Sequence, residues 1–280
     1  MYGKKWISQS SKNCTNYTHP KITSPKSLND HRLISILPTL SKVFENVIYS
    51  RLYSFVTSNC ILSPQQYGFR TNHSIELAIA AIYDDMICNK DNKLITCTLF
   101  LELSEAFDCV DHKILLEKLF YYRVKGTPLK LLASYLDNRF QCTKIGDTKS
   151  SFFNVTCGVP EGSVVGPLLF LIYILMTLWK PPTLILFYML MISICIFRGK
   201  NTKSYKKTVN HELKKIDHWV RANKLCINYS KSNFMLMNNH KNINFAVSIN
   251  HHPISKQSSL NSLALYLMIN LIGSLKLKSW

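Results

Sequence analysis

One segment restricts what this chain can fold into more than any other: from Val164 to Phe197 it contains no Asp or Glu. Such an apolar stretch must be buried, either in a protein core or in a lipid bilayer. Its two arms, 164–179 and 183–197, are separated by Lys180, Pro181 and Pro182. Each arm is shorter than the ~20 residues that a helix needs to cross a ~30 Å hydrocarbon core. We therefore expect a protein core and no membrane, and a membrane hairpin at 164–197 is the less favoured alternative.

The charge of the chain favours a polyanionic partner. Thirty-four Lys and Arg against sixteen Asp and Glu give a formal net charge of +18. Nucleic acid suits this surplus best, and an anionic membrane surface is the competing partner. With 280 residues, 47% of them hydrophobic, the chain is long and apolar enough to be globular.

The cysteines and the first residues bear on the cellular compartment. Nine cysteines lie between Cys14 and Cys226 without a CxxC pair or zinc-finger spacing, which argues against a disulfide framework and a structural zinc. The opening MYGKKWISQSSKN lacks the apolar region of a secretory signal. We expect reduced thiols and an intracellular location, in the nucleus or the cytoplasm.

Apolar periodicity predicts several amphipathic helices after an extended or disordered lead-in at 1–30, where we expect no core. The apolar stripe of the first helix consists of Leu40, Val43, Phe44, Val47, Ile48, Leu52, Phe55 and Val56. Further helices are predicted at 72–89, after Asp111, and at 205–220. Another is predicted from Thr127, which would cap it, with Pro128 in its first turn.

Two segments have the character of β-structure. Leu94–Leu103 is a short β-rich apolar run that suits a buried strand, and Arg139–Cys157 suits a hairpin that turns near Gly146. Helices and strands mixed in this order predict an α+β fold with an antiparallel sheet packed on helices. Fold alone gives no function, which has to come from particular side chains.

Two stretches could carry chemistry. LFLELSEAFDCVDH, residues 99–112, puts Glu102 at the end of the predicted strand and Phe107 five residues later, a layout that could hold a metal. CGVPEGSVVGPLLF, residues 157–170, combines a tight turn with the start of a helix whose free N–H groups suit anions. Taken singly, each has an ordinary explanation: a Glu that meets solvent at a strand end, and a common turn before a helix.

Five segments in order resemble the motifs of non-LTR (LINE-like, jockey-type) retrotransposon reverse transcriptases. HRLISILPTLSKVFENVIYSRL and LSPQQYGFRTNHSIELA resemble two fingers motifs, LFLELSEAFDCVDH palm motif A, GVPEGSVVGPLLFLIYI motif B and NKLCINYSKSNFMLMNN motif D. The likeness spans Lys21 to Asn239. It implies a right-hand polymerase with fingers at 31–93, a palm at 94–240, and a thumb that is missing or truncated in the segment 241–280.

The resemblance also implies roles for single residues. Glu102 stands at the metal-binding Asp of motif A, and Lys231 matches the motif D lysine assigned to protonating the departing pyrophosphate. Phe107 matches the aromatic residue under the nucleotide sugar, and Glu161 falls where motif B has Gln beside the incoming nucleotide. The other nucleotide-binding positions are Gly158, Pro160 and Gly162 of motif B and the basic fingers residues Arg32 and Arg70.

This family copies an RNA template onto a DNA primer with two Mg²⁺ ions. Several departures argue against productive Mg²⁺ binding here. Glu102 in place of Asp moves the carboxylate outward by one methylene, whereas Mg²⁺ demands near-ideal octahedral geometry. Glu161 in place of Gln adds a negative charge near a triphosphate, and Leu33 replaces a Pro with less consequence. No obligate protein partner is evident.

The Asp pair of motif C is absent, since the chain runs LMTLWKPPTLILFYMLMISICIF from 175 to 197. Met has the single codon ATG, so a frame shifted by one base across Met189–Ile192 permits Tyr-Ala-Asp-Asp. The same shift across Leu175–Leu178 permits Asn-Asp-Leu. We therefore predict a frameshift over 175–198, between indels near Ile174 and before Gly199. The predicted protein is a catalytically inactive reverse transcriptase domain, and the alternative is a residual nucleic-acid-binding protein without enzyme activity.

Overall fold

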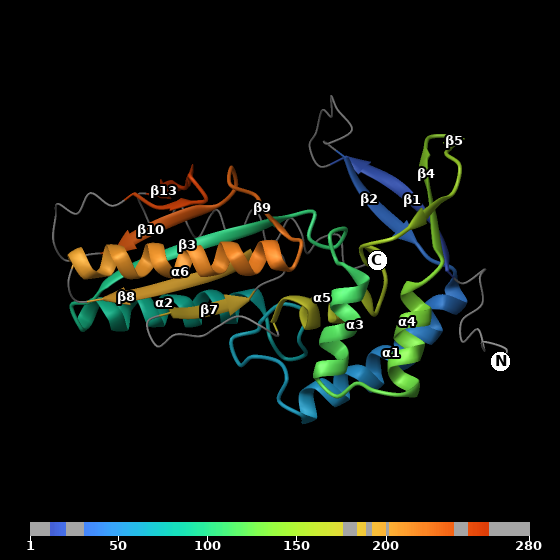
Figure 1. Ribbon diagram of the computed structural model, residues 1–280, viewed down its shortest axis with the longest axis horizontal. Helices are drawn as coiled ribbons and strands as arrows, with labels where there is room; N and C mark the ends of the chain where they lie inside the picture. The colour runs from blue at the N-terminus through green and yellow to red at the C-terminus, as the bar shows by residue number, and fades with distance from the viewer. Residues whose placement is uncertain are drawn as a thin grey trace. The chain divides into compact units, whose positions relative to one another are not determined.

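The computed structural model describes residues 12–20, 31–175, 184–188, 192–199, 202–237 and 246–257. These residues form the predicted α+β fold, with two larger sheets and one small hairpin (Figure 1). The chain divides into two compact units, 1–62 with 106–176 and 63–105 with 177–280. Each unit therefore combines two separate stretches of chain. The assignment of fingers, palm and thumb stays a prediction.

The sheet of the first unit has the strand order β2-β1-β4-β5, with β6 also paired to β4. Its strands are β1 (Asn13–Pro20), β2 (His31–Ile36), β4 (Arg139–Ile145), β5 (Thr148–Lys149) and β6 (Phe153–Val155). β1 pairs antiparallel with β2 and parallel with β4. β5 and β6 return antiparallel along β4, so the predicted hairpin is confirmed, with Gly146 in its turn at φ +55°.

The prediction that residues 1–30 contribute no core is wrong for β1. Cys14 is buried, and so is Asn16. The Asn16 amide donates to Gln141 Oε1 at 3.2 Å, and the Ser35 hydroxyl donates to Asn16 Oδ1 at 2.7 Å. Polar side chains are therefore satisfied inside this sheet, which is why a segment rich in Asn and Thr forms a buried strand.

The described helices of the first unit are α1 (Thr39–Ser58), α3 (His112–Tyr121), α4 (Thr127–Leu136) and α5 (Gly166–Leu175). Asp111 caps α3, since its Oδ1 accepts from the Ile114 N–H at 3.0 Å. The N-cap of α4 is Gly126, not the predicted Thr127, while a Pro in the first turn is confirmed. Gly126 has φ +65°, a left-handed conformation that favours glycine at this cap.

The apolar stripe of α1 is buried only in its second half. Leu52 and Val56 lie in the core, whereas Leu40 is 70% and Phe44 59% exposed. In the first half the buried side chains are instead Ser41 and Glu45. The predicted helix is confirmed. Glu45 lies about two turns before Leu52 and three before Val56, so it shares their buried face, whereas Leu40 and Phe44 lie off it.

The sheet of the second unit has the order β13-β10-β3-β8-β7, with β9 paired to β3. Its strands are β3 (Ile95–Ser104), β7 (Leu184–Tyr188), β8 (Ile192–Gly199), β9 (Cys226–Ile227), β10 (Asn233–Met237) and β13 (Ser255–Gln257). β3 lies at its centre, antiparallel to β8 and β10. A separate hairpin is formed by β11 (Ser248–Ile249) and β12 (His252–Pro253).

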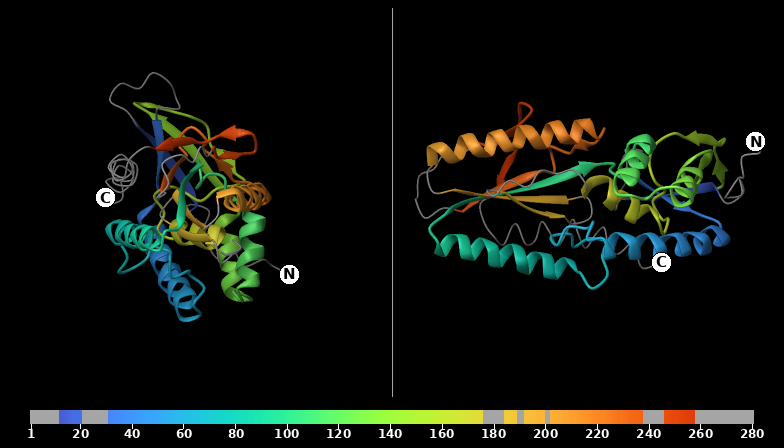
Figure 2. Two further views of the ribbon diagram at one scale, coloured as in Figure 1. Left: turned by 90° about the vertical axis from the view of Figure 1, so that its left-hand side faces the viewer. Right: turned by 60° about the horizontal axis from the view of Figure 1, so that its bottom comes forward.

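Helices α2 (Ile75–Asp91) and α6 (Thr202–Ala222) cover opposite faces of this sheet (Figure 2). The core beneath α2 consists of Ile75, Ala78, Ile82, Met86, Phe100, Ile194, Ile196 and Met235. On the α6 side, the Tyr205 hydroxyl accepts from the Cys97 N–H at 2.7 Å and donates to Phe197 O at 2.9 Å. The predicted helices at 72–89 and 205–220 and the strand at 94–103 are therefore confirmed.

The acid-free segment at 164–197 contributes to both units. Its described parts are α5, β7 and β8, and the α5 side chains from Leu168 to Ile174 are buried. Among the described residues, no helix combines the length and the apolar character needed to cross a membrane.

Candidate active site

Glu102 lies near the end of the central strand of the second unit. Its backbone N–H donates to Ser232 Oγ at 3.2 Å, and its carbonyl accepts from the Asn228 N–H at 2.8 Å. Ser232 in turn donates its hydroxyl to Asn228 O at 2.7 Å. The turn that precedes β10 therefore fixes the backbone at Glu102 from one side.

The same turn carries Lys231, and the structure brings the two predicted catalytic residues together. Lys231 Nζ lies 3.2 Å from Glu102 Oε1. The carboxylate side chain is 15% exposed and the lysine side chain 58%. Glu102 therefore has an ammonium group beside it where the family places metal ions.

The expected position of motif C is next to Glu102 along the backbone. Ile192, the first residue of β8, is the strand partner of Glu102, and Tyr188 at the end of β7 pairs with Ser193. Met189–Met191 lie outside the described residues. The pairing of β3 with β8 thus places Ile192 opposite Glu102, and the sequence at 189–192 supplies no carboxylate.

These residues do not fit a two-Mg²⁺ centre. Two-metal phosphoryl transfer needs carboxylates that converge on ions ~3.5–4 Å apart. In the described part of the chain, no group of three or more His, Cys, Asp or Glu side chains is arranged to hold a metal ion. Glu102 is a single carboxylate, and one of its oxygens is engaged by Lys231.

The predicted nucleotide-binding loop of motif B belongs to the first unit, and its glycines are required by close approaches. Gly158 has φ +87°, and a Cβ there would lie 3.0 Å from Asp108 O. Gly162 has φ +113°, and a Cβ there would lie 2.6 Å from Ser35 O. The Ser35 N–H also donates to Glu161 O at 2.8 Å, so β2 is bonded directly to the loop.

The helix start after this loop is less open to anions than the sequence predicts. The Val164 N–H donates to Glu45 Oε2 at 2.6 Å, and the Gly166 N–H donates to Ser163 Oγ at 3.1 Å. Ser163 Oγ itself donates to Pro160 O at 2.8 Å. Two of the N–H groups expected to be free are therefore occupied, one of them by a carboxylate that opposes an approaching anion.

Phe107 is buried beneath the same loop. Its ring stacks on Phe170 of α5 with centroids 4.9 Å apart, and its carbonyl accepts from the Val159 N–H at 2.8 Å. The His112 ring contacts Gly158 O through Nε2 at 2.7 Å. Phe107 therefore supports the loop, which is compatible with a role under the sugar but leaves that role a prediction.

The two arginines predicted to bind phosphate in the fingers, Arg32 and Arg70, lie in different local structures. Arg32 lies on β2, where it pairs with His19, and its side chain is outside the described residues. Arg70 donates from Nη1 to Ser63 O at 3.0 Å and is half-buried. At least one donor of Arg70 therefore stabilises its own loop, and phosphate contact by either arginine stays a prediction.

No motif marks the residues that hold these parts in position, namely Glu45, Ser35, His112, Asn228 and Ser232. The only signal available for Glu45 was its isolation as an acidic residue within the apolar run SKVFENVI. The other four are small or polar residues whose role depends on partners far along the chain.

The comparison with protein families decides what this arrangement represents. The model of the family described as reverse transcriptase (RNA-dependent DNA polymerase) matches residues 22–263, most of the chain. This chain belongs to the reverse transcriptase family. Its similarity to polymerases of Drosophila mobile elements makes it a reverse transcriptase domain of the non-LTR retrotransposon type, as the motifs predicted.

This reverse transcriptase domain is similar to three proteins of Drosophila melanogaster. It is 36% identical over 51% of its length to the probable RNA-directed DNA polymerase from transposon X-element, of which it covers 16%. It is 35% identical over 54% of its length to the corresponding protein from transposon BS, of which it again covers 16%. For the RNA-directed DNA polymerase from mobile element jockey, the identity is 30% over 55% of this chain and 17% of the relative.

Solved structures support the fold. Telomerase from Candida tropicalis, in complex with a fragment of telomeric RNA, aligns with a TM-score of 0.59, covering 96% of this domain and 50% of the telomerase chain. A truncated apo form of that enzyme aligns with a TM-score of 0.56 over 87% of this domain and 53% of the other chain. At 13% and 12% identity, these similarities establish a shared polymerase fold and nothing more.

Proposed function

We propose that this reverse transcriptase domain still binds an RNA template and a DNA primer but does not support productive two-metal catalysis. The observation that carries the proposal is the ion pair between Lys231 Nζ and Glu102 Oε1 at 3.2 Å. An ammonium group in this position neutralises the carboxylate that stands at the metal-binding position of motif A. Because the chain covers only 16–17% of its three Drosophila melanogaster relatives, the activity of a longer protein is also part of the proposal.

The loss of catalysis follows from charge. Both metal ions in phosphoryl transfer stabilise negative charge on the attacking and departing oxygens, and each needs hard carboxylate ligands. Glu102 contributes one carboxylate, and Ile192, its strand partner, contributes none. Glu161 adds a negative charge to the loop in place of a neutral amide, which disfavours a triphosphate.

Primer extension on a primed RNA template with Mg²⁺ tests this. The unmodified chain is expected to yield no extension. A repaired chain with Glu102→Asp, Glu161→Gln and the shifted motif C frame restored is expected to extend the primer. The matched control carries the two point substitutions without the frame repair, and we expect it to be inactive because the motif C carboxylates are still absent. Extension by the unmodified chain would refute the proposal.

Retained binding has a separate test. A domain with a net charge of +18 that contacts phosphates releases counterions on binding, so its affinity should fall steeply with salt. Anisotropy of a labelled primer–template measured across a salt series provides the slope. An affinity that does not change with salt contradicts phosphate binding, whatever the result of primer extension.

The frameshift is decided at the level of DNA. The hypothesis requires a one-base indel near Ile174 and a compensating one before Gly199, because only then do both Leu175–Leu178 and Met189–Ile192 recover family motifs. Sequencing of the coding locus and translation in three frames checks it. A shifted frame without a Tyr-Ala-Asp-Asp-like quartet opposite Met189–Ile192 rules it out.

A further inference from the structure

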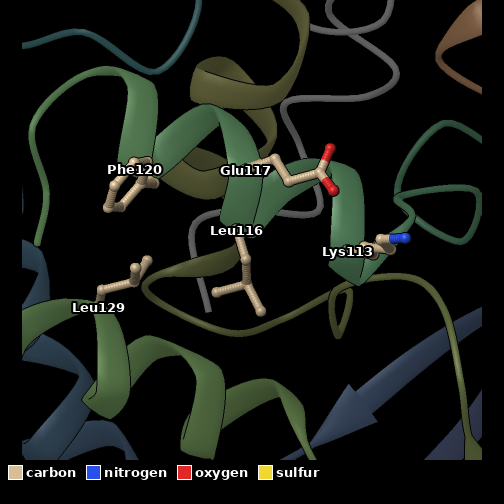
Figure 3. Close-up of a pocket in the computed structure, with 5 residues that line it drawn as sticks. All are labelled: Lys113, Leu116, Glu117, Phe120 and Leu129. Carbon is tan, nitrogen blue, oxygen red and sulfur yellow. The ribbon is translucent and has the colours of Figure 1, made fainter.

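A groove outside the site described above lies between α3 and α4 in the first unit. It has a volume of about 520 Å³, is open to solvent, and is lined by Lys113, Leu116, Glu117, Phe120 and Leu129. Figure 3 shows Leu116 and Phe120 from α3 and Leu129 from α4 around one space, with Lys113 at the end away from Phe120. The groove thus has an apolar floor and a charged end.

Exposed aromatic rings lie at the C-terminal end of α3, where Phe120 lines the groove. Phe120 is 53% exposed and Tyr121 78% exposed. Tyr121 meets the Tyr122 ring edge-on at a centroid distance of 5.2 Å. Lys125 Nζ lies 4.8 Å from the centroid of the Phe120 ring. Aromatic faces accompanied by cations are what proteins use to stack bases of single strands while neutralising their phosphates.

The charge around the groove favours a polyanion. Two exposed cations lie at the groove, since Lys113 lines it and Lys125 lies over the ring of Phe120, and Glu117 is the one carboxylate among its lining residues. A purely apolar partner helix would leave these cations without a counterpart, and a duplex would offer the rings no unpaired base to stack on. Single-stranded nucleic acid supplies both phosphates and free base faces.

The groove is also continuous with the motif B loop. His112, the first residue of α3, contacts Gly158 O at 2.7 Å, and Lys113 follows it directly. Phe120 is seven residues beyond Lys113, about 10 Å along a helix axis. A strand that leaves the loop could therefore follow α3 from Lys113 to the aromatic end.

We propose that the α3–α4 groove binds single-stranded nucleic acid. Bases stack on Phe120 and Tyr121, and phosphates contact Lys113 and Lys125. The inference rests on the proposed function, since it adds a single-strand track to a domain that binds primer and template. It assigns these residues a role that metal chemistry at Glu102 does not require.

The test compares binding of a short single-stranded oligonucleotide and a blunt duplex, using anisotropy with the full chain. Phe120→Leu combined with Lys125→Gln is expected to weaken single-strand binding about 10-fold or more, because stacking of one base contributes about 1–3 kcal/mol. Duplex binding should change by less than about 3-fold, the effect of one surface charge. Glu117→Gln should strengthen single-strand binding, since it removes the one carboxylate at the groove.

The chain offers a matched control on another surface. Lys149 Nζ lies 5.0 Å from the centroid of the Phe152 ring, and Phe152 is also exposed. Phe152→Leu with Lys149→Gln makes the same chemical change away from the groove and should leave single-strand binding within about 3-fold of the unmodified chain.

The outcomes separate the two proposals. The groove inference is wrong if the groove variant does not weaken single-strand binding, or weakens it no more than the control does, while the unmodified chain still binds primer–template. If the unmodified chain binds neither ligand, the proposed function itself fails. A groove variant that loses binding of an acidic peptide but keeps binding of the oligonucleotide also overturns the inference, in favour of a protein partner.

Discussion

Lys231 Nζ and Glu102 Oε1 are 3.2 Å apart, so the predicted proton donor of motif D forms an ion pair with the predicted metal ligand of motif A. The backbone makes this pairing possible, because Asn228 and Ser232 tie the same turn to the Glu102 peptide. A metal ion that approached Glu102 would have to displace an ammonium group. Among the described residues, Lys231 is therefore the charged partner of Glu102 at this end of β3.

Replacing Lys231 by Gln should lower the free energy of unfolding only slightly. The lysine is largely exposed, so its ion pair contributes about 0.2–1 kcal/mol. Lys215→Gln is the matched control, because Lys215 forms a pair with Glu212 at 3.0 Å and has a similarly exposed cation and buried carboxylate. Urea unfolding measures both. A loss above about 2 kcal/mol for Lys231→Gln alone would show that Glu102 depends on this partner more than an exposed pair allows.

Gly162→Ala should destabilise the motif B loop strongly. The residue has φ +113°, and an added Cβ would lie 2.6 Å from Ser35 O, so backbone strain and overlap combine. Gly146→Ala isolates the first effect, since Gly146 has φ +55° with nothing within 4 Å of its Cβ position. We expect a loss of about 1–2 kcal/mol for the control and a larger one for Gly162→Ala. Equal losses in thermal unfolding would mean that the contact with Ser35 relaxes freely.

Lys118 predicts a pH dependence of stability. It is buried, its Nζ donates to Tyr173 O, and burial lowers the pKa of Lys118 from 10.5 to about 8. The unfolded chain therefore binds more protons than the folded chain between these two values, so the contribution of Lys118 to the free energy of unfolding rises with pH across that window. The full difference corresponds to at most about 3 kcal/mol.

Lys118→Met should remove this contribution, because methionine fills the site without a titrating group. The measurement is the difference in unfolding free energy between variant and unmodified chain from pH 7 to pH 10, in which other titrating groups largely cancel. Lys113→Met, an exposed lysine on the same helix, is the control and should leave the slope unchanged. If the slope is the same with and without Lys118, burial does not shift its pKa in the way stated.

The sequence correctly predicted the helices whose apolar residues repeat at the helical period and pack against one face of a sheet. The α2 stripe from Ile75 to Met86 and the α6 stripe from Tyr205 to Val220 are buried as expected, because each helix has one sheet face to cover. The prediction was wrong where long-range polar contacts decide the packing. β1 is buried through partners on β2 and β4, and the first half of α1 turns Glu45 inward.

The candidate site could be predicted as a set of positions but not as an arrangement. The motifs identify Glu102 and Lys231, and no local pattern indicates that their side chains meet. Their contact depends on the pairing of β10 with β3, which brings Lys231 beside Glu102 although the two are far apart in the sequence. The occupied Val164 N–H before α5 was missed for the same reason, since its acceptor Glu45 comes from a helix far earlier in the chain.

Glu45 should therefore be among the most sensitive polar positions of the first unit. It is buried, its Oε1 accepts from the Tyr135 hydroxyl at 3.0 Å, and its Oε2 accepts from the Val164 N–H at 2.6 Å. Glu45→Ala leaves the buried Tyr135 hydroxyl and the half-buried Val164 N–H without this acceptor. Since each unsatisfied donor costs about 1–3 kcal/mol, we expect a total loss of about 2–6 kcal/mol.

Tyr135→Phe is the matched variant for this network, because it removes the tyrosine hydroxyl and leaves the bond from Glu45 to Val164 in place. Its expected loss is about 1–2 kcal/mol, smaller than that of Glu45→Ala. Urea unfolding of both variants gives the order, and limited proteolysis between Pro160 and Val164 reports the loop directly, with faster cleavage expected only for Glu45→Ala. If both variants are equally stable and the loop is cleaved at an unchanged rate, the carboxylate does not hold the motif B loop, and α1 is connected to it only through packing.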